Sequence, residues 1–190
     1  LNSTGNTGSI VGKFANIALG TKLGVSNAGT GAVNFGFKAA SVTGAADAAD
    51  LSVAGNTSTG LVTLDSIETV NVTSAAKAGV SAANYLQLGG NAVETVSVSG
   101  AKAVTLDLQG LAGTLKTVSA ADATGNLTVD LSAALTEETT ITLGSGADSI
   151  DLSGSGSKKV TLNTGAGNDT VKIEAGGKHV IDLGAGNDTL

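Results

Sequence analysis

Three glycine-rich segments near the C-terminal end of the sequence each end in an aspartate. They are 144–148 (Gly-Ser-Gly-Ala-Asp), 165–169 and 184–188 (both Gly-Ala-Gly-Asn-Asp). Glycine permits sharp turns that expose backbone carbonyl oxygens, and each aspartate adds a carboxylate. Such hard oxygen ligands suit Ca²⁺. The candidate metal ligands are therefore Gly144, Gly146, Asp148, Gly165, Gly167, Asp169, Gly184, Gly186 and Asp188.

The spacing of the three turns predicts how many ions they hold. One turn supplies fewer oxygens than the about six to eight that Ca²⁺ prefers, but two turns stacked one coil apart can hold an ion between them. Three turns are then expected to form two sites, with the middle residue Asp169 serving both. If these were glycine turns without metal, three stacked carboxylates would repel one another uncompensated.

Short segments of apolar, polar and apolar residues lie between these turns. They are 141–143, 150–152, 160–162, 171–173 and 181–183. This alternation is typical of β-strands with one buried face. The segments start about ten residues apart, so two strands and two turns would form a coil of about 20 residues. The sequence therefore predicts an all-β fold, a parallel β-solenoid (β-helix or calcium β-roll) with aliphatic residues inside and polar residues outside.

The alternation continues upstream with longer spacing. One series contains 70–72, 96–98 and 118–120, and a second contains 86–88, 106–108 and 127–129. Near-copies at 67–70, 93–96 and 115–118 support a repeat.

These patterns divide the chain into three parts. Residues 1–59 are an irregular β-rich part that can begin the solenoid, and residues 60–140 form calcium-free coils. Residues 141–190 form the calcium β-roll, truncated at its C-terminal end.

Composition narrows the function classes. The 190 residues are 41% hydrophobic, enough for a buried core, but only 2% aromatic, so no site can rest on stacking rings. A net charge of −6, with lysine as the only strongly basic residue, argues against nucleic acid as a partner. No apolar run is long enough for membrane insertion. The chain starts at Leu1 without a signal segment, which indicates an internal fragment.

The other reactive residues are not grouped for chemistry. His179 is the only histidine and the chain has no cysteine, so we expect a solvated turn residue rather than a zinc or catalytic site. Lys158 and His179 each lie two residues before an expected strand on the opposite edge, where a cation argues against calcium. We expect no catalytic residue, no organic cofactor and no enzymatic activity.

The three turns resemble the repeats-in-toxin (RTX) family, whose motif is G-G-x-G-x-D-x-U-x with U an aliphatic residue. The resemblance covers residues 141–190, and Leu143, Thr164 and Leu183 replace the first glycine. It implies a Ca²⁺-binding β-roll that folds outside the cell, where calcium is abundant, after type I secretion. The secretion signal would lie near the C-terminus of the intact protein, beyond this fragment.

The upstream Thr/Ala/Val-rich part, with phrases such as Ile-Glu-Thr-Val-Asn-Val at 67–72, is similar to surface-layer (S-layer) proteins of Gram-negative bacteria such as Caulobacter and Campylobacter. This resemblance implies a structural module at the extracellular cell surface that assembles with other copies into a calcium-dependent two-dimensional lattice, with cell-surface polysaccharide as another candidate partner. The alternatives are a spacer in a large secreted RTX adhesin and a calcium-dependent polysaccharide lyase or epimerase. The absence of arginine and the single tyrosine, Tyr85, argue against the enzymes.

Overall fold

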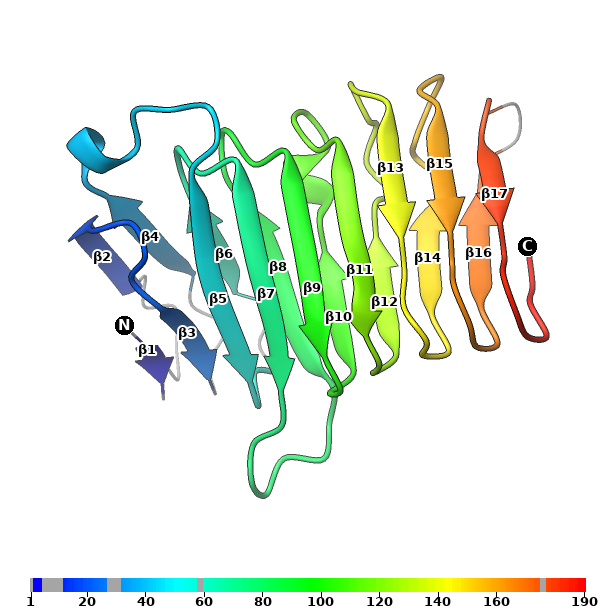
Figure 1. Ribbon diagram of the computed structural model, residues 1–190, viewed down its shortest axis with the longest axis horizontal. Helices are drawn as coiled ribbons and strands as arrows, with labels where there is room; N and C mark the ends of the chain where they lie inside the picture. The colour runs from blue at the N-terminus through cyan, green and yellow to red at the C-terminus, as the bar shows by residue number, and fades with distance from the viewer. Residues whose placement is uncertain (1, 5–11, 27–31, 58–59, 175–176) are drawn as a thin grey trace.

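The computed structural model describes residues 2–4, 12–26, 32–57, 60–174 and 177–190. The chain winds as a parallel β-solenoid built from two sheets, which confirms the predicted fold class. Figure 1 shows the coils following one another along the long axis, from the N-terminal to the C-terminal end. No helix in the described part of the chain is long and apolar enough to cross a membrane.

Odd-numbered strands form one sheet and even-numbered strands the other. The first sheet contains β1 (Asn2–Thr4), β3 (Leu23–Ser26), β5 (Ala48–Ala54), β7 (Thr69–Ala75), β9 (Thr95–Gly100), β11 (Thr117–Ala123), β13 (Thr139–Thr142), β15 (Val160–Asn163) and β17 (Val180–Asp182). The second contains β2 (Gly12–Ile17), β4 (Val33–Phe37), β6 (Leu61–Leu64), β8 (Asn84–Gly89), β10 (Val104–Asp107), β12 (Leu127–Asp130), β14 (Ser149–Leu152) and β16 (Thr170–Ile173). Two short 3₁₀ turns, η1 (Ala39–Ser41) and η2 (Gln109–Leu111), lie in connections.

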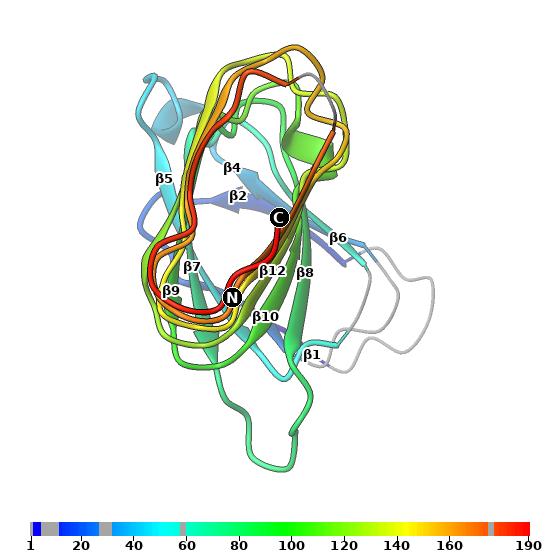
Figure 2. The same cartoon turned by 90° about the vertical axis from the view of Figure 1, so that its right-hand side faces the viewer.

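The period-two alternation explains why these segments form a solenoid. Inward-facing aliphatic residues from both sheets stack coil upon coil in one core, including Val70, Val96 and Val118 of the first sheet. A single coil cannot bury its apolar face alone, so each coil depends on its neighbours. Figure 2, along the solenoid, shows the later coils overlying one another with the sheets on opposite sides.

The near-copies in the sequence occupy equivalent positions. Thr69 pairs with Thr95, and Thr95 with Thr117, on the outer face of the first sheet. Ile67, Val93 and Leu115, each two residues earlier, are fully buried. The repeated phrase therefore encodes one buried corner and one outward threonine per coil.

The N-terminal part belongs to the same sheets. β3 pairs with β5, which pairs with β7, and β4 pairs with β6. Its irregularity has a local cause, because β2 carries a register shift between Phe14 and Ile17. The Phe14 and Phe35 rings stack with centroids 5.3 Å apart.

The register of the C-terminal coils differs from a simple alignment of first apolar residues. Ile141 pairs with Leu162, and Leu162 with Ile181, whereas Val160 lies opposite Thr139. Because a shift of two residues preserves the alternation of faces, the pattern alone left this choice open. Ile173 was expected inside but is 37% exposed, because the described part of the following coil pairs with β16 only at its start, around Thr170.

Candidate metal site

The three glycine-rich turns lie on one edge of the solenoid, where the chain passes from the first sheet to the second (Figure 1). Gly165 lies directly over Gly144, so that a Cβ on Gly165 would meet the carbonyl oxygen of Gly144. Gly184 has the same relation to Gly165, and the column of the second glycines, Gly146, Gly167 and Gly186, repeats it. Glycine is therefore required by close approach between coils.

The two downstream turns also need glycine for their backbone conformation. The φ angles are +90° and +136° at Gly165 and Gly167, and +71° and +149° at Gly184 and Gly186. Other residues rarely adopt these angles. Turns 165–169 and 184–188 have the same sequence, and both hold their two glycines at positive φ. The N–H of Ala185 in the second turn donates to the Gly165 carbonyl in the first at 2.9 Å.

The three aspartates form a ladder that runs in one direction. The backbone N–H of Leu127 donates to Asp148 Oδ1 at 2.8 Å, that of Asp148 to Asp169 Oδ1 at 2.8 Å, and that of Asp169 to Asp188 Oδ1 at 2.9 Å. Each carboxylate thus reaches toward the preceding coil. The structure brings the predicted aspartates together in one column, but it places each side chain in the gap before its own turn.

Within the described part of the chain, one oxygen of each of the first two carboxylates lacks a hydrogen-bond partner. Asp148 is 2% exposed and Asp169 is 1% exposed. Among the described residues, neither Asp148 Oδ2 nor Asp169 Oδ2 has a hydrogen-bond partner. A buried charge without compensation costs several kcal/mol or more. A proton or a metal cation bound to these oxygens would therefore stabilise the folded protein.

The environment of Asp148 disfavours its charged form. Burial raises the pKa of its carboxyl to about 6, and the nearby Asp169 carboxylate adds to the increase. The backbone N–H groups of Leu127 and Gly144 act in the opposite direction but do not cancel the increase in the pKa.

Aspartates on the outer face of the second sheet show a different pattern. Asp107, Asp130 and Asp151 are consecutive in register at the ends of β10, β12 and β14. Asp130 Oδ2 accepts from Gln109 Nε2 at 2.9 Å, and Asp151 Oδ2 pairs with Lys172 Nζ at 2.8 Å. The Lys172 contact, together with Ser153, lowers the pKa of Asp151 to about 2. These outer carboxylates have partners. Among the described residues, the buried side-chain oxygens without one are those of Asp148 and Asp169 in the ladder and, far from the glycine turns, Asp47 Oδ2 and Asn56 Oδ1.

Asn84 shows how the same column is satisfied without a charge. It pairs with Val104, which pairs with Leu127, so it lies in line with the aspartates further along the solenoid. Its Nδ2 lies 2.9 Å from Ser74 Oγ and 3.0 Å from the carbonyl oxygens of Val53 and Ala75. Here a neutral amide occupies the position of the carboxylate, its Oδ1 accepts from the Asn56 N–H at 3.2 Å, and its Nδ2 supplies the positive hydrogens.

The position at which the sequence departs from the repeats-in-toxin motif is part of the core. Leu143 and Thr164 are buried, and Leu183 is partly buried. Thr164 Oγ1 donates to the Leu183 carbonyl at 2.6 Å, so it joins two coils. The replacement of glycine here therefore contributes packing and a hydrogen bond.

The donor set defines which metal could fit. The described residues contain no group of three or more His, Cys, Asp or Glu side chains that could hold a metal ion. An ion at this edge would need backbone carbonyl oxygens in addition to one carboxylate per gap. Ca²⁺ generally binds such all-oxygen sets, whereas structural zinc sites in proteins are built mainly from nitrogen and sulfur ligands.

No family model, curated protein or solved structure matches this chain.

His179 on the opposite edge was expected to be a solvated turn residue, but it is half-buried and bonded. Its Nδ1 accepts from the Val160 N–H at 3.3 Å, and its Nε2 lies 3.2 Å from Ser155 Oγ. In the tautomer that this implies, Nε2 carries the proton and donates to the serine. In this tautomer Nε2 cannot accept the serine proton.

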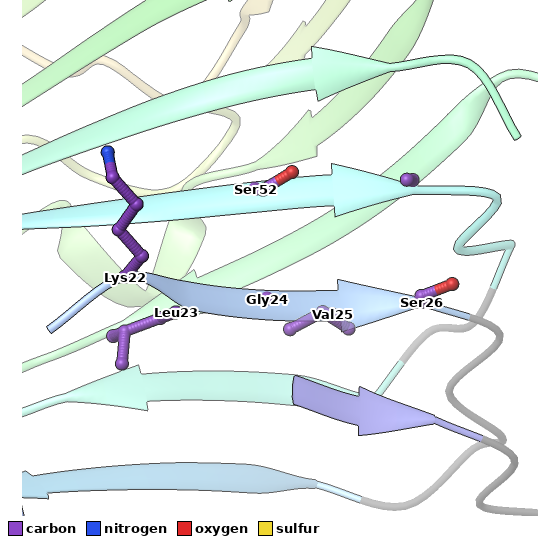
Figure 3. Close-up of a pocket in the computed structure, with 7 residues that line it drawn as sticks. Lys22, Leu23, Gly24, Val25, Ser26 and Ser52 are labelled. Carbon is purple, nitrogen blue, oxygen red and sulfur yellow. The ribbon is translucent and has the colours of Figure 1, made fainter. Parts of the chain in front are cut away.

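Two surface hollows of about 280 Å³ each lie over the first sheet. Figure 3 shows one beside β3, where Lys22, Ser26 and Ser52 are the polar side chains around a short apolar stretch. The other is lined by Asn71, Asp122 and small residues. Neither brings together an acid, a base and a nucleophile.

The buried Asp148 carboxyl predicts an unusual pH dependence when no metal is bound. Its pKa of about 6 in the folded protein lies above the ordinary 3.8, so the protonated carboxyl favours the folded state. This contribution to the free energy of unfolding is fully present below about pH 4 and is lost as the pH rises through about 6. Over this range it amounts to at most about 3 kcal/mol. In chelator, we expect the melting temperature to fall over this range and the Asp148→Asn variant to lose most of this slope. An unchanged slope in the variant would exclude Asp148 as its source.

Proposed function

We propose that the glycine turns bind Ca²⁺ in the gaps between neighbouring coils. The buried Asp169 Oδ2, without a hydrogen-bond partner among the described residues, is the observation that carries this proposal. Asp169 would provide the charged ligand between turns 144–148 and 165–169, and Asp188 the one between 165–169 and 184–188. Carbonyl oxygens of the glycine columns would complete each site. The ion would neutralise the buried carboxylates and cross-link consecutive coils.

The biological role that we propose is structural. The chain would be a module of a secreted bacterial surface-layer protein whose folding and lattice assembly depend on calcium. The extended solenoid and the regular outer rows of threonine, such as Thr95 and Thr117, support this proposal because they offer repeating polar surfaces. Other copies of the intact protein are the proposed partners.

An enzymatic role is not part of the proposal. The Ser155–His179 pair is oriented against proton abstraction, and the hollow shown in Figure 3 lacks converging charges. The spacer of a secreted adhesin remains the second candidate, because it would use the same calcium-stabilised coils.

Calcium should order the C-terminal coils and magnesium should not. Ca²⁺ tolerates the many-oxygen, irregular geometry that stacked turns offer, whereas Mg²⁺ requires near-octahedral ligands. Hydrogen exchange of the chain in chelator, millimolar Ca²⁺ or millimolar Mg²⁺ tests this. We expect Ca²⁺ to slow exchange at least tenfold across residues 144–190 and to change the buried region around Asn84 much less. Equal protection by Mg²⁺ would argue against the calcium site.

The lattice is tested on the intact surface protein. We expect electron microscopy to show ordered two-dimensional sheets at millimolar calcium and their loss in chelator. Protein that binds calcium but stays as separate rods would instead support the adhesin spacer.

A further inference from the structure

A fourth glycine turn lies one coil before the three that the motif identifies. Residues 124–127 read Thr-Gly-Asn-Leu, and Leu127 occupies the position that aspartate has in the later turns. The ladder establishes this equivalence, since Leu127 N–H donates to Asp148 just as Asp148 N–H donates to Asp169. The next residues, Thr128 and Ser149, pair in register.

This turn stacks against turn 144–148 much as the later turns stack on one another. A Cβ on Gly146 would lie 2.7 Å from the Cα of Asn126 and 2.8 Å from the carbonyl oxygen of Gly125. The N–H of Ala147 donates to Asn126 Oδ1 at 3.1 Å. The same bond recurs two coils later, where Asn187 N–H donates to Asn168 Oδ1 at 2.9 Å.

The Asp148 carboxylate enters this upstream gap. Its Oδ1 reaches Leu127 N–H at 2.8 Å, across the interface between the two coils. Its Oδ2 is buried without a hydrogen-bond partner among the described residues, as is Asp169 Oδ2 in the next gap. A cation in the upstream gap would therefore compensate Asp148 Oδ2 in the same way as a cation in the next gap would compensate Asp169 Oδ2.

We propose that the gap between turns 124–127 and 144–148 is an additional calcium site, so that the chain binds three ions. The proposal rests on the proposed function of the later turns. Asp148 supplies the carboxylate, and Asn126 Oδ1 and the Gly125 carbonyl are the neighbouring oxygens of the preceding turn. Leu127 hides this site from the sequence motif, because the carboxylate comes from the following coil. Calcium dependence then begins at about residue 124 rather than 141.

Calcium stoichiometry of the full chain tests the proposal. We expect native mass spectrometry and calorimetric titration to give three ions for the parent and two for Asp148→Asn, which keeps an oxygen for Leu127 N–H but removes the charge. Asn126→Ala should weaken the same site by at least tenfold while leaving all three aspartates in place. Asp151→Asn, in the same coil but on the outer face, is the matched control and should keep three ions.

Hydrogen exchange locates the lost ion. In the parent, calcium should protect residues 124–127, and in Asp148→Asn this protection should disappear while that at 165–190 persists. A parent that binds two ions, or an Asp148→Asn variant that keeps three, would overturn the third site and leave the proposed function intact. A parent that binds no calcium would overturn both.

Discussion

Replacing Asp169 with asparagine is expected to stabilise the protein in chelator and destabilise it in calcium. Without metal, the variant removes a buried charge next to Asp148 while its amide oxygen can still accept the Asp148 N–H. We expect a gain of about 1–2 kcal/mol, in the range for relieving an unsatisfied buried group. With calcium, the variant lacks the charged ligand and loses the stabilisation of the bound ion, about 2.7 kcal/mol at a hundredfold excess over the dissociation constant.

Thermal melts of the parent and variant across calcium concentration would measure this crossover. Asp169→Ala separates charge from hydrogen bonding, because it also removes the acceptor for Asp148 N–H and should destabilise the protein with or without calcium. Asp122→Asn, an exposed change on β11, should shift neither curve. If Asp169→Asn were less stable than the parent even in chelator, the Asp169 carboxylate would not be an uncompensated buried charge in the metal-free protein.

The ion count of Asp169→Asn also tests how the carboxylates are shared. The motif implies that the middle aspartate serves two ions. The structure instead points its carboxylate toward turn 144–148, while Asp188 reaches into the following gap. We therefore expect Asp169→Asn to lose one ion. Loss of two ions would instead support the arrangement in which Asp169 serves both sites.

The stacking of the coils could be predicted because the sequence repeats a simple physical requirement. Aliphatic residues two apart, as at Ile150 and Leu152, need a buried face, and the copies at 67–70 and 93–96 fix the partner coil. The N-terminal part lacks that regularity. There β2 shifts its register between Phe14 and Ile17, where Asn16 has a positive φ of 58°, and no alternation pattern encodes such a shift.

The candidate site was only partly predictable from the sequence. The glycine and aspartate spacing identified which residues share an edge, but spacing does not say toward which neighbouring coil a carboxylate points. That direction became visible only with the bonds from Leu127 and Asp148 N–H groups. Gly125-Asn126, two and one residues before Leu127, repeats Gly167-Asn168 before Asp169, and this was the signal that could have identified the fourth turn.

The backbone angle and the space around a glycine predict how much stability is lost when one methyl group is added there. Gly156 has a φ of +66° and no described atom within 4 Å of a Cβ, so Gly156→Ala should cost only the left-handed backbone, about 1 kcal/mol. Gly154 lacks a positive φ, but its Cβ would collide with the Ser132 carbonyl oxygen. Gly167 combines a φ of +136° with a collision against the Gly146 carbonyl oxygen. Gly167→Ala should therefore cost at least about 3 kcal/mol.

The calcium dependence of these losses separates turn geometry from ligand chemistry. Gly154→Ala and Gly156→Ala lie on the opposite edge and should lower stability equally with and without calcium. Gly167→Ala pushes apart the two turns that would hold an ion, so its loss should be larger in calcium than in chelator by the stabilisation of that ion. Denaturant unfolding of the three variants in both conditions measures this difference. If Gly167→Ala cost no more than Gly156→Ala, the close contact between coils would not exist in solution. If its cost were independent of calcium, the gap beside Gly167 would not be an ion site.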